Sequence, residues 1–188
     1  MVIRLSVAAL PRTILPPALF TSLILTVKAR MDVLNAVSLL RRQGLQVDSV
    51  TARPSAELYN RCKLAYPNDI RLLRLLPAIS TGEAYEVEQT LVAQMFSGSL
   101  TKLKGQYESL SYVWGSEKKP KSITIIFVEL GNEAFMFKCS ITEKLWMALT
   151  DLRSTSQHRD IWTDALCINQ LDLQEKNIQV AQMRNVYT

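Results

Sequence analysis

The stretch from Ile161 to Tyr187 constrains the fold most, because a short apolar run is followed directly by a helix-start signal. Residues Ile161–Ile168 are mostly apolar with β-formers at both ends, which predicts a strand buried on both faces of a parallel sheet. Asp172 is then expected as a helix N-cap, with Glu175 placed to complete a capping box. This part of the chain is therefore expected to form a strand, a polar loop and a helix.

Asn169 and Gln170 lie in the polar loop between the expected strand and the expected helix. Open α/β sheets bind ligands at the carboxyl ends of parallel strands, and a helix N-terminus adds unpaired backbone N–H groups there. We therefore expect these two side chains at the mouth of a ligand site.

The helix after Asp172 is expected to be amphipathic. Its predicted apolar face consists of Leu173, Val180, Met183, Val186 and Tyr187. Gln179 falls within the same face. A hydrogen bond to a neighbouring backbone group is the first interpretation of this glutamine, and a ligand contact is the alternative.

The preceding residues predict a second unit of the same kind. Tyr107–Val113 is expected to be a strand, and Ile123–Val128 and Ala134–Cys139 flank a Gly-Asn pair in the pattern of a hairpin. Ser140, with Glu143 three residues later, is expected to start a helix. Two strand–helix units imply an α/β fold with a parallel sheet, right-handed crossovers and an inserted β-hairpin.

The first 69 residues show a weaker pattern. A helix is expected from Asp32 and a second short one after Pro54, with residues 46–54 as a linker between them. Residues 1–31 are basic with a short apolar core, so a signal peptide, a transit peptide and a wrongly assigned gene start all remain open. That core is too short for a stable membrane span. Ile70–Leu76, rich in branched side chains, is expected to be a strand.

Charge and cysteine usage narrow the function classes. The net charge of +5 arises in the first 80 residues, without a lysine or arginine run interleaved with aromatic residues, so no nucleic-acid partner is expected. Three dispersed cysteines and one histidine support neither a disulfide framework nor a metal site. A cytoplasmic location follows, with N-terminal targeting still open. Cys167 is interpreted as a small hydrophobic residue of the buried strand.

Three segments resemble the fungal heterokaryon-incompatibility (HET) domain. They are Tyr107–Gly115, which reads Tyr-Glu-Ser-Leu-Ser-Tyr-Val-Trp-Gly, the helix around Leu145–Arg153, and Trp162–Gln170, which reads Trp-Thr-Asp-Ala-Leu-Cys-Ile-Asn-Gln. Lys144 and Thr163 depart from the family pattern. The resemblance covers roughly residues 70–188, whereas residues 1–69 are unassigned.

The resemblance implies a role in non-self recognition, a form of innate immunity in which fusion of incompatible fungal individuals leads to programmed cell death. It also implies action through protein assembly or partner binding. The family is distantly similar to Toll/interleukin-receptor (TIR) domains, which have a flavodoxin-like parallel sheet. Some TIR domains cleave NAD with a glutamate on a later βα unit. No such unit precedes Thr188, so the HET domain is expected to be incomplete at its C-terminal end.

The resemblance and the expected sheet together mark seven candidate ligand-binding or motif residues. These are Tyr112, Trp114, Gly115, Asp164, Asn169, Gln170 and Gln179. Trp114 offers a flat wall for a ring, with core packing as an equal alternative. Gly115 can adopt a backbone conformation that other residues cannot adopt without strain.

The sequence leaves open whether the chain is an enzyme. Cleavage of a nicotinamide–ribose bond develops oxocarbenium charge, which a nearby carboxylate would stabilise. The carboxylates near the expected mouth are Asp164, Asp172 and Glu175. Asp172 and Glu175 are explained as helix caps. For Asp164, inside a buried strand, a structural hydrogen bond is the first interpretation and direct chemistry the alternative.

Three hypotheses result from these observations. The first is a HET-domain protein that acts through assembly or a protein partner. The second is a TIR-like NAD glycohydrolase, for which NAD is the ligand by analogy alone and Asp164 or Glu175 the candidate acid. The third is an inactive fragment or remnant of a longer HET protein.

Overall fold

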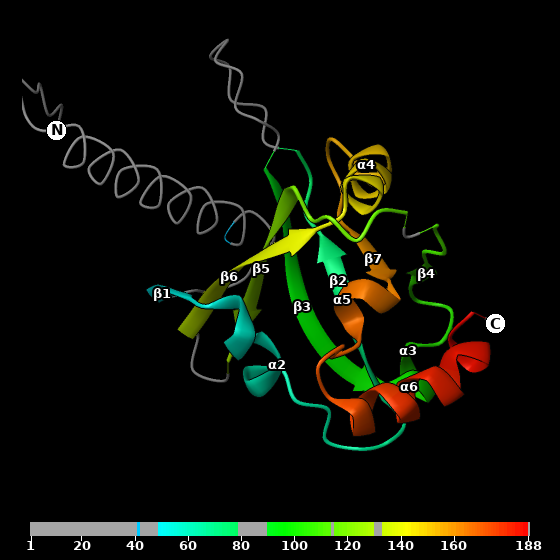
Figure 1. The fold of residues 1–188 in the computed structure, drawn as a ribbon. Coiled ribbons are helices and arrows are strands. Elements are labelled where there is room, and N and C mark those ends of the chain that lie inside the picture. The colour runs from blue at the N-terminus through cyan, green and yellow to red at the C-terminus, as the bar shows by residue number, and fades with distance from the viewer. Residues whose placement is uncertain (1–40, 42–48, 79–89, 114, 130–132, 188) are drawn as a thin grey trace, which may run out of the picture.

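The structure is a computed structural model that describes residues 41, 49–78, 90–113, 115–129 and 133–187. The helix expected from Asp32, the basic leader and Trp114 lie outside these residues. Within the described part, strands form one continuous sheet, and helices α2, α5 and α6 lie in front of it in the view of Figure 1.

The sheet has seven strands among the described residues, in the order β1-β6-β5-β3-β2-β7-β4. Their bounds are β1 Ser49–Arg53, β2 Asp69–Leu75, β3 Leu91–Ser99, β4 Glu108–Ser109, β5 Lys121–Val128, β6 Glu133–Ile141 and β7 Arg159–Trp162. Three neighbouring pairs are parallel, namely β1 with β6, β3 with β5 and β4 with β7. The others are antiparallel, so the sheet is mixed.

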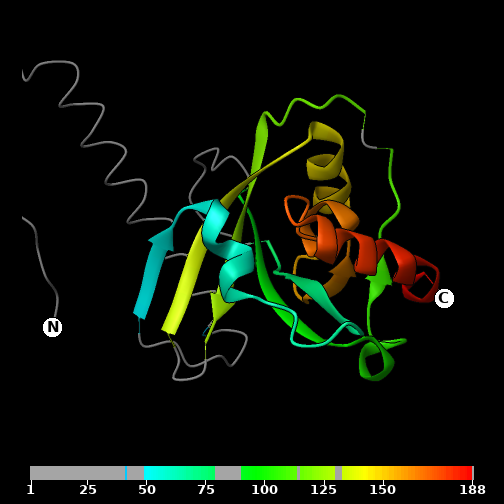
Figure 2. The same ribbon diagram turned by 60° about the horizontal axis from the view of Figure 1, so that its bottom comes forward.

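Among the residues that the structure describes, the helices are short except for α4 and α6. Their bounds are η1 Ser55–Glu57, α2 Leu58–Arg61, α3 Leu100–Leu103, α4 Glu143–Leu152, α5 Asp164–Cys167 and α6 Leu173–Val186. Figure 2 shows α6 crossing in front of the sheet, with the end of the described chain beyond its last turn. None of the described helices has the length and apolar character needed to cross a lipid bilayer.

The α/β fold class expected from the sequence is confirmed. The strands of the two predicted strand–helix units, β4 and β7, pair in parallel, and β5 and β6 form the predicted antiparallel hairpin within the same sheet. The flavodoxin-like strand arrangement suggested by the TIR resemblance remains a prediction.

The strand predicted over Tyr107–Val113 is wrong in length, because only Glu108 and Ser109 pair with β7. The length of β4 is limited by the length of its neighbour, β7. Strand β7 is four residues long, and the N–H of Leu110 donates to the carbonyl of Trp162 at 2.8 Å, at the end of that strand. Beyond this bond the chain leaves the edge of the sheet.

The N-terminal half contains both confirmed and missed elements. Strand β2 confirms the predicted Ile70–Leu76 strand, and α2 confirms the short helix after Pro54. The linker predicted over residues 46–54 is wrong over Ser49–Arg53, where β1 pairs in parallel with β6 at the edge of the sheet, and residues 46–48 lie outside the described part of the chain. Strand β3 was not predicted, although it is the longest partner of β2. A domain boundary near residue 70 remains a prediction.

The predicted helix starts are close to the observed ones. Helix α4 begins after Thr142, whose hydroxyl accepts from the N–H of Leu145 at 3.3 Å, so the predicted cap at Ser140 is wrong by two residues. Strand β6 continues through Ser140, which explains the shift. The N-cap at Asp172 is confirmed, because its carboxylate accepts from the N–H groups of Gln174 and Glu175.

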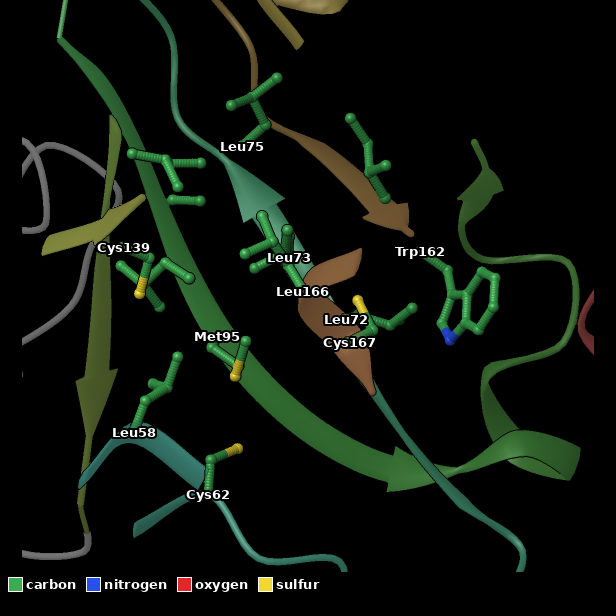
Figure 3. Close-up of a cluster of buried hydrophobic side chains, with 14 of the residues drawn as sticks. Leu58, Cys62, Leu72, Leu73, Leu75, Met95, Cys139, Trp162, Leu166 and Cys167 are labelled. Atoms are coloured by element: carbon green, nitrogen blue, oxygen red, sulfur yellow. The ribbon is translucent and has the colours of Figure 1, made fainter. Parts of the chain in front are cut away.

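The main core lies on the face of the sheet that α2, α5 and α6 cover. Figure 3 shows Leu73, Leu166 and Cys167 gathered where α5 lies over β2. Trp162 projects from the end of β7 toward the β4 segment and is fully buried. A smaller apolar cluster on the other face consists of Leu76, Val92, Ile126 and Ala134. Along β3, β5 and β6, alternation separates the two clusters, whereas β2 contributes residues of both its faces to the main cluster.

The orientation of α6 differs from the predicted amphipathic packing. Val186 is buried as expected, but Leu173, Val180 and Tyr187 are 72, 49 and 41 % exposed. The helix instead turns Glu175, Gln179 and Gln182 toward the body, where each has a hydrogen-bond partner on another segment. Glu175, Gln179 and Gln182 are four and three residues apart, so they share one face of α6. Their polar contacts therefore determine which face of the helix points toward the sheet.

The buried cysteines predict a pH dependence of stability. Burial raises the pKa of Cys167 to about 12 and that of Cys139 to about 11. A thiol whose pKa is raised in the folded state stabilises that state below the pKa of the unfolded chain, near 8.5, and loses this contribution as pH rises toward the folded value. We expect the free energy of unfolding in urea to fall between pH 8.5 and 11, and to fall less steeply in Cys167→Ala. Equal slopes for the two proteins would contradict this account.

Candidate functional site

A fully buried arginine joins three segments at the centre of the candidate site. Arg71 on β2 donates to the carbonyls of Cys62 at 2.6 Å and Cys167 at 3.2 Å. It also makes a two-pronged contact with Glu175, at 2.5 Å to Oε1 and 2.8 Å to Oε2. The end of α2, the end of α5 and the first turn of α6 are thereby fixed to one strand. A bidentate guanidinium–carboxylate pair is among the strongest polar contacts in proteins.

The electrostatics of this pair favour its charged form. Burial alone would lower the pKa of Arg71, but the hydrogen bond and the negative charge of Glu175 outweigh it, so the pKa lies above its ordinary value. Glu175 Oε1 also accepts from the N–H of Asn169 at 2.8 Å. The predicted capping-box contact is therefore replaced, because the Glu175 carboxylate reaches Asn169 and Arg71 instead of the N–H of Asp172. Both oxygens are occupied, which supports the structural interpretation of this carboxylate.

A groove of about 450 Å³ lies beside the start of α6. We call it the α6 groove. One wall consists of residues 59, 60 and 63–67, and the other of Asn169, Asp172, Gln174, Glu175, Ile178 and Gln179. Three residues singled out from the sequence, Asn169, Glu175 and Gln179, are therefore brought together at one concave surface. The N-terminus of a helix opens onto it, as the sequence predicts.

Gln179 is the most buried polar side chain of this groove, at 1 % exposure. Its Nε2 donates to the backbone carbonyl of Asp69 at 2.8 Å, which confirms the predicted hydrogen bond to a neighbouring backbone group. Its Oε1 has no hydrogen-bond partner. Oε1 is itself buried, and the alternative interpretation, a ligand contact, remains a prediction.

The prediction that residues 161–168 form one buried strand is wrong. Strand β7 ends at Trp162, and Asp164–Cys167 form the short helix α5, whose N-cap is Thr163. An apolar run of eight residues does not distinguish a strand from a buried helix by periodicity alone. Asp164 consequently lies half-buried at a helix start, not inside a strand. Asn169 and Gln170 follow a helix, and Gln170 Nε2 bonds back to the carbonyl of Asp164 at 2.8 Å.

A second polar group of residues surrounds Asp164. Burial raises the pKa of Tyr112 and of Tyr187, and the charge of Asp164 raises both further, so the three side chains are electrostatically coupled. The Tyr187 ring meets Trp162 edge to face, with centroids 5.5 Å apart. Trp162 Nε1 and Thr163 Oγ1 are buried without a hydrogen-bond partner. We call these five residues the Asp164 cluster.

The remaining predicted residues lie elsewhere. Gly115 adopts φ +69°, the left-handed conformation that glycine permits. A Cβ at this position would stand 3.0 Å from the side chain of Lys144, so the glycine also allows close packing against α4. It does not line the α6 groove. The residues of the single pocket expected from the sequence are thus found at the α6 groove, in the Asp164 cluster and at the Gly115–Lys144 contact.

Arg71 was missed by sequence reasoning, although a signal was present. It lies in the predicted Ile70–Leu76 strand, and a charged side chain in a covered strand needs an oppositely charged partner. Glu175, assigned to a helix cap, is that partner. Tyr59 and Lys63 were also missed as groove residues, because nothing in the local pattern relates residues 59–67 to α6.

Comparison with known proteins finds a family similarity for the C-terminal part of the chain. Residues 107–188 match the sequence model of the heterokaryon incompatibility protein (HET) family. The part of the chain that contains β4 to α6 is thus similar to a HET domain.

Over 87 residues the chain is also 34 % identical to heterokaryon incompatibility protein 6, OR allele, of Neurospora crassa. This similarity covers 44 % of the chain but only 13 % of that relative. No solved structure matches the chain.

The buried Arg71–Glu175 pair generates a stability prediction. We expect Glu175→Gln to lower the free energy of unfolding by about 3–5 kcal/mol, because it leaves the fully buried guanidinium without a counter-charge. Glu129→Gln is the matched control. It removes the partner of Arg61, a pair whose side chains are 25 and 37 % exposed, and should cost at most about 1 kcal/mol. Urea unfolding of the three proteins measures both, and similar losses would refute the central role of Arg71.

Proposed function

We propose that this chain acts in fungal heterokaryon incompatibility, in which recognition of non-self leads to programmed cell death, and that it acts through protein assembly or binding of a protein partner. The match of residues 107–188 to the HET family supports the biological process. The outward face of α6 supports the mode of action.

Helix α6 carries three large apolar side chains that are exposed, Leu173, Ile178 and Val180. Leu173 and Val180 are exposed and lie seven residues apart, so they form one stripe on the solvent side of the helix. Tyr187 follows at the same spacing, but its ring packs against the buried Trp162. We call Leu173 and Val180 the α6 stripe.

Lys176 and Asn177 stand between the two, so the stripe is not contiguous. Helix-in-groove contacts nevertheless use apolar anchors at i and i+7, which is the spacing of Leu173 and Val180. This stripe is the single observation on which the proposed mode of action rests.

The test is expression of the full chain in a fungal host from an inducible promoter, with colony growth and dye exclusion as readouts. We expect induction to arrest growth, and we expect Leu173→Glu combined with Val180→Glu to abolish the arrest, because two carboxylates cannot be desolvated in an apolar interface. Both sites are exposed, so circular dichroism should be unchanged.

Met147→Glu is the matched control, since Met147 is a large exposed apolar residue on α4. It should leave the arrest intact. Failure of the unsubstituted chain to arrest growth would refute the proposed process for this chain. Arrest that persists in the doubly substituted chain would refute the α6 stripe as its means.

A second candidate function, cleavage of NAD, is favoured by the Asp164 cluster. Two buried donors without partners, Trp162 Nε1 and Thr163 Oγ1, accompany a carboxylate and two tyrosines. In such a reaction water attacks the ribose C1′, the bond to nicotinamide breaks, nicotinamide leaves with the bonding electron pair and a proton is released. A carboxylate such as Asp164 would stabilise the oxocarbenium charge that develops.

Incubation of the purified chain with NAD, followed by chromatographic detection of nicotinamide, tests this candidate. We expect Asp164→Asn to lower the rate by about a hundredfold or more, because the developing positive charge loses its counter-charge. Asp151→Asn, at an exposed aspartate of α4, should leave it unchanged. A rate in the unsubstituted chain no higher than in Asp164→Asn would eliminate the enzymatic candidate and leave assembly or partner binding.

A further inference from the structure

The face of the sheet opposite the main core is buried, although no described helix contributes a residue to its apolar cluster. We call this face the second face. Its cluster consists of Leu76, Val92, Ile126 and Ala134, which are at most 6 % exposed. The partly buried side chains that pack against the cluster belong to strands β1, β5 and β6. Helices α2, α5 and α6 lie over the other face (Figure 1).

Neighbouring strands alone do not bury side chains to this extent. On an open face of a sheet, side chains stand upright, so they touch their cross-strand neighbours while their ends remain in water. Ile126 is fully buried, and Thr124, two residues earlier on the same face of β5, is 8 % exposed. This burial occurs within one chain, so a second copy is not its cause. The cover of the second face therefore belongs to the same chain.

Residues 32–43 have the sequence pattern that such a cover needs. Val33, Val37 and Leu40 recur at i, i+4 and i+7, so they form one apolar stripe if this segment is helical. Ser38 and Arg42 fall on the opposite side of the same helix. A helix of this length is about 18 Å long. Strands β6, β5 and β3 and the end of β2, which carry the cluster, span about 14 Å at the usual strand spacing, so one helix is long enough to cross them.

The chain also brings this segment to the right edge of the sheet. Arg41 is the only residue before Ser49 that the structure describes, and it is helical and exposed. On a helix it lies beside the apolar stripe and not within it, which agrees with its exposure. The short connection of residues 42–48 leads into β1, the edge strand that borders the second face through Val50. A helix that ends near Arg41 is therefore joined directly to the border of that face.

The other long segment outside the described residues, 79–89, fits the second face less well. It connects β2 to β3 and contains Glu83, Glu86 and Glu88 within six residues. An unpaired carboxylate is costly to bury against apolar side chains. Charge therefore favours residues 32–43 over residues 79–89 as the cover.

We propose that residues 32–43 form an amphipathic helix whose stripe of Val33, Val37 and Leu40 packs on the second face of the sheet, against Val92 and Ile126. The sheet then has helices on both faces, which is the usual solution for an α/β domain. This inference goes beyond the proposed function, because it gives part of the unassigned N-terminal region a place in the fold. It does not depend on the α6 stripe.

The test is NMR of the full chain with ¹³C-labelled methyl groups of isoleucine, leucine and valine. We expect nuclear Overhauser effects between the methyl groups of Val37 or Leu40 and those of Val92 or Ile126. A sample mixed from labelled and unlabelled chains separates contacts within one chain from contacts between two chains. The expected effects are those within one chain.

A matched pair of substitutions tests the same contact by its stability. We expect Val37→Asp to lower the midpoint of urea unfolding and to raise the fluorescence of the dye ANS severalfold, because a carboxylate cannot pack on the apolar face and the face becomes accessible. Ser38→Asp adds the same charge on the opposite side of the expected helix and should change neither quantity. Val37→Ala, with a smaller loss in the urea midpoint expected, serves if Val37→Asp does not fold.

Three results would overturn the proposal. The first is that the methyl groups of Val92 and Ile126 show contacts with Ile79 or Val87 but none with Val33, Val37 or Leu40. The second is that the contacts with residues 32–43 arise only between chains. The third is that neither Val37→Asp nor Val37→Ala lowers the urea midpoint more than Ser38→Asp does.

Discussion

The described structure depends on one buried charge. Arg71 lies on a central strand, has no solvent contact, and satisfies its guanidinium with two backbone carbonyls and the carboxylate of Glu175. Such an arginine is tolerated only where every donor has a partner. Segments 96 and 104 residues away along the chain must therefore arrive at fixed positions. The positions of α5 and α6 relative to the sheet follow from this requirement as much as from apolar burial.

Sequence patterns predicted the elements that local chemistry determines. The hairpin β5–β6, the strand β2 and the cap at Asp172 each depend on neighbouring residues, and each is confirmed. The run Ile161–Ile168 was assigned wrongly because its composition suits a strand or a buried helix, and the start of α5 after Thr163 depends on where β7 loses its partners. Strand β1 escaped prediction because its partner, β6, is remote in the chain.

The candidate site was predictable only in part, for the same reason. Asn169, Glu175 and Gln179 were singled out from the capped helix that they surround, and all three line the α6 groove. Their partners Arg71 and Asp69 belong to a strand about 100 residues earlier, so the contacts themselves could not be read from local spacing. Asp164 and Asn169 were expected at one mouth, but α5 separates the two, and Asp164 instead acts on Tyr112 and Tyr187.

The polar inner face of α6 has a further consequence. An apolar helix face tolerates sliding, because one methyl group replaces another at little cost. Glu175, Gln179 and Gln182 instead meet Arg71, Asp69 and Pro67 one to one, and a shift by a single turn, about 5.4 Å, would leave each of these groups unmatched. The helix therefore has a unique register against the sheet. The outer surface of α6 is therefore presented to any binding partner at one position and in one orientation relative to the sheet.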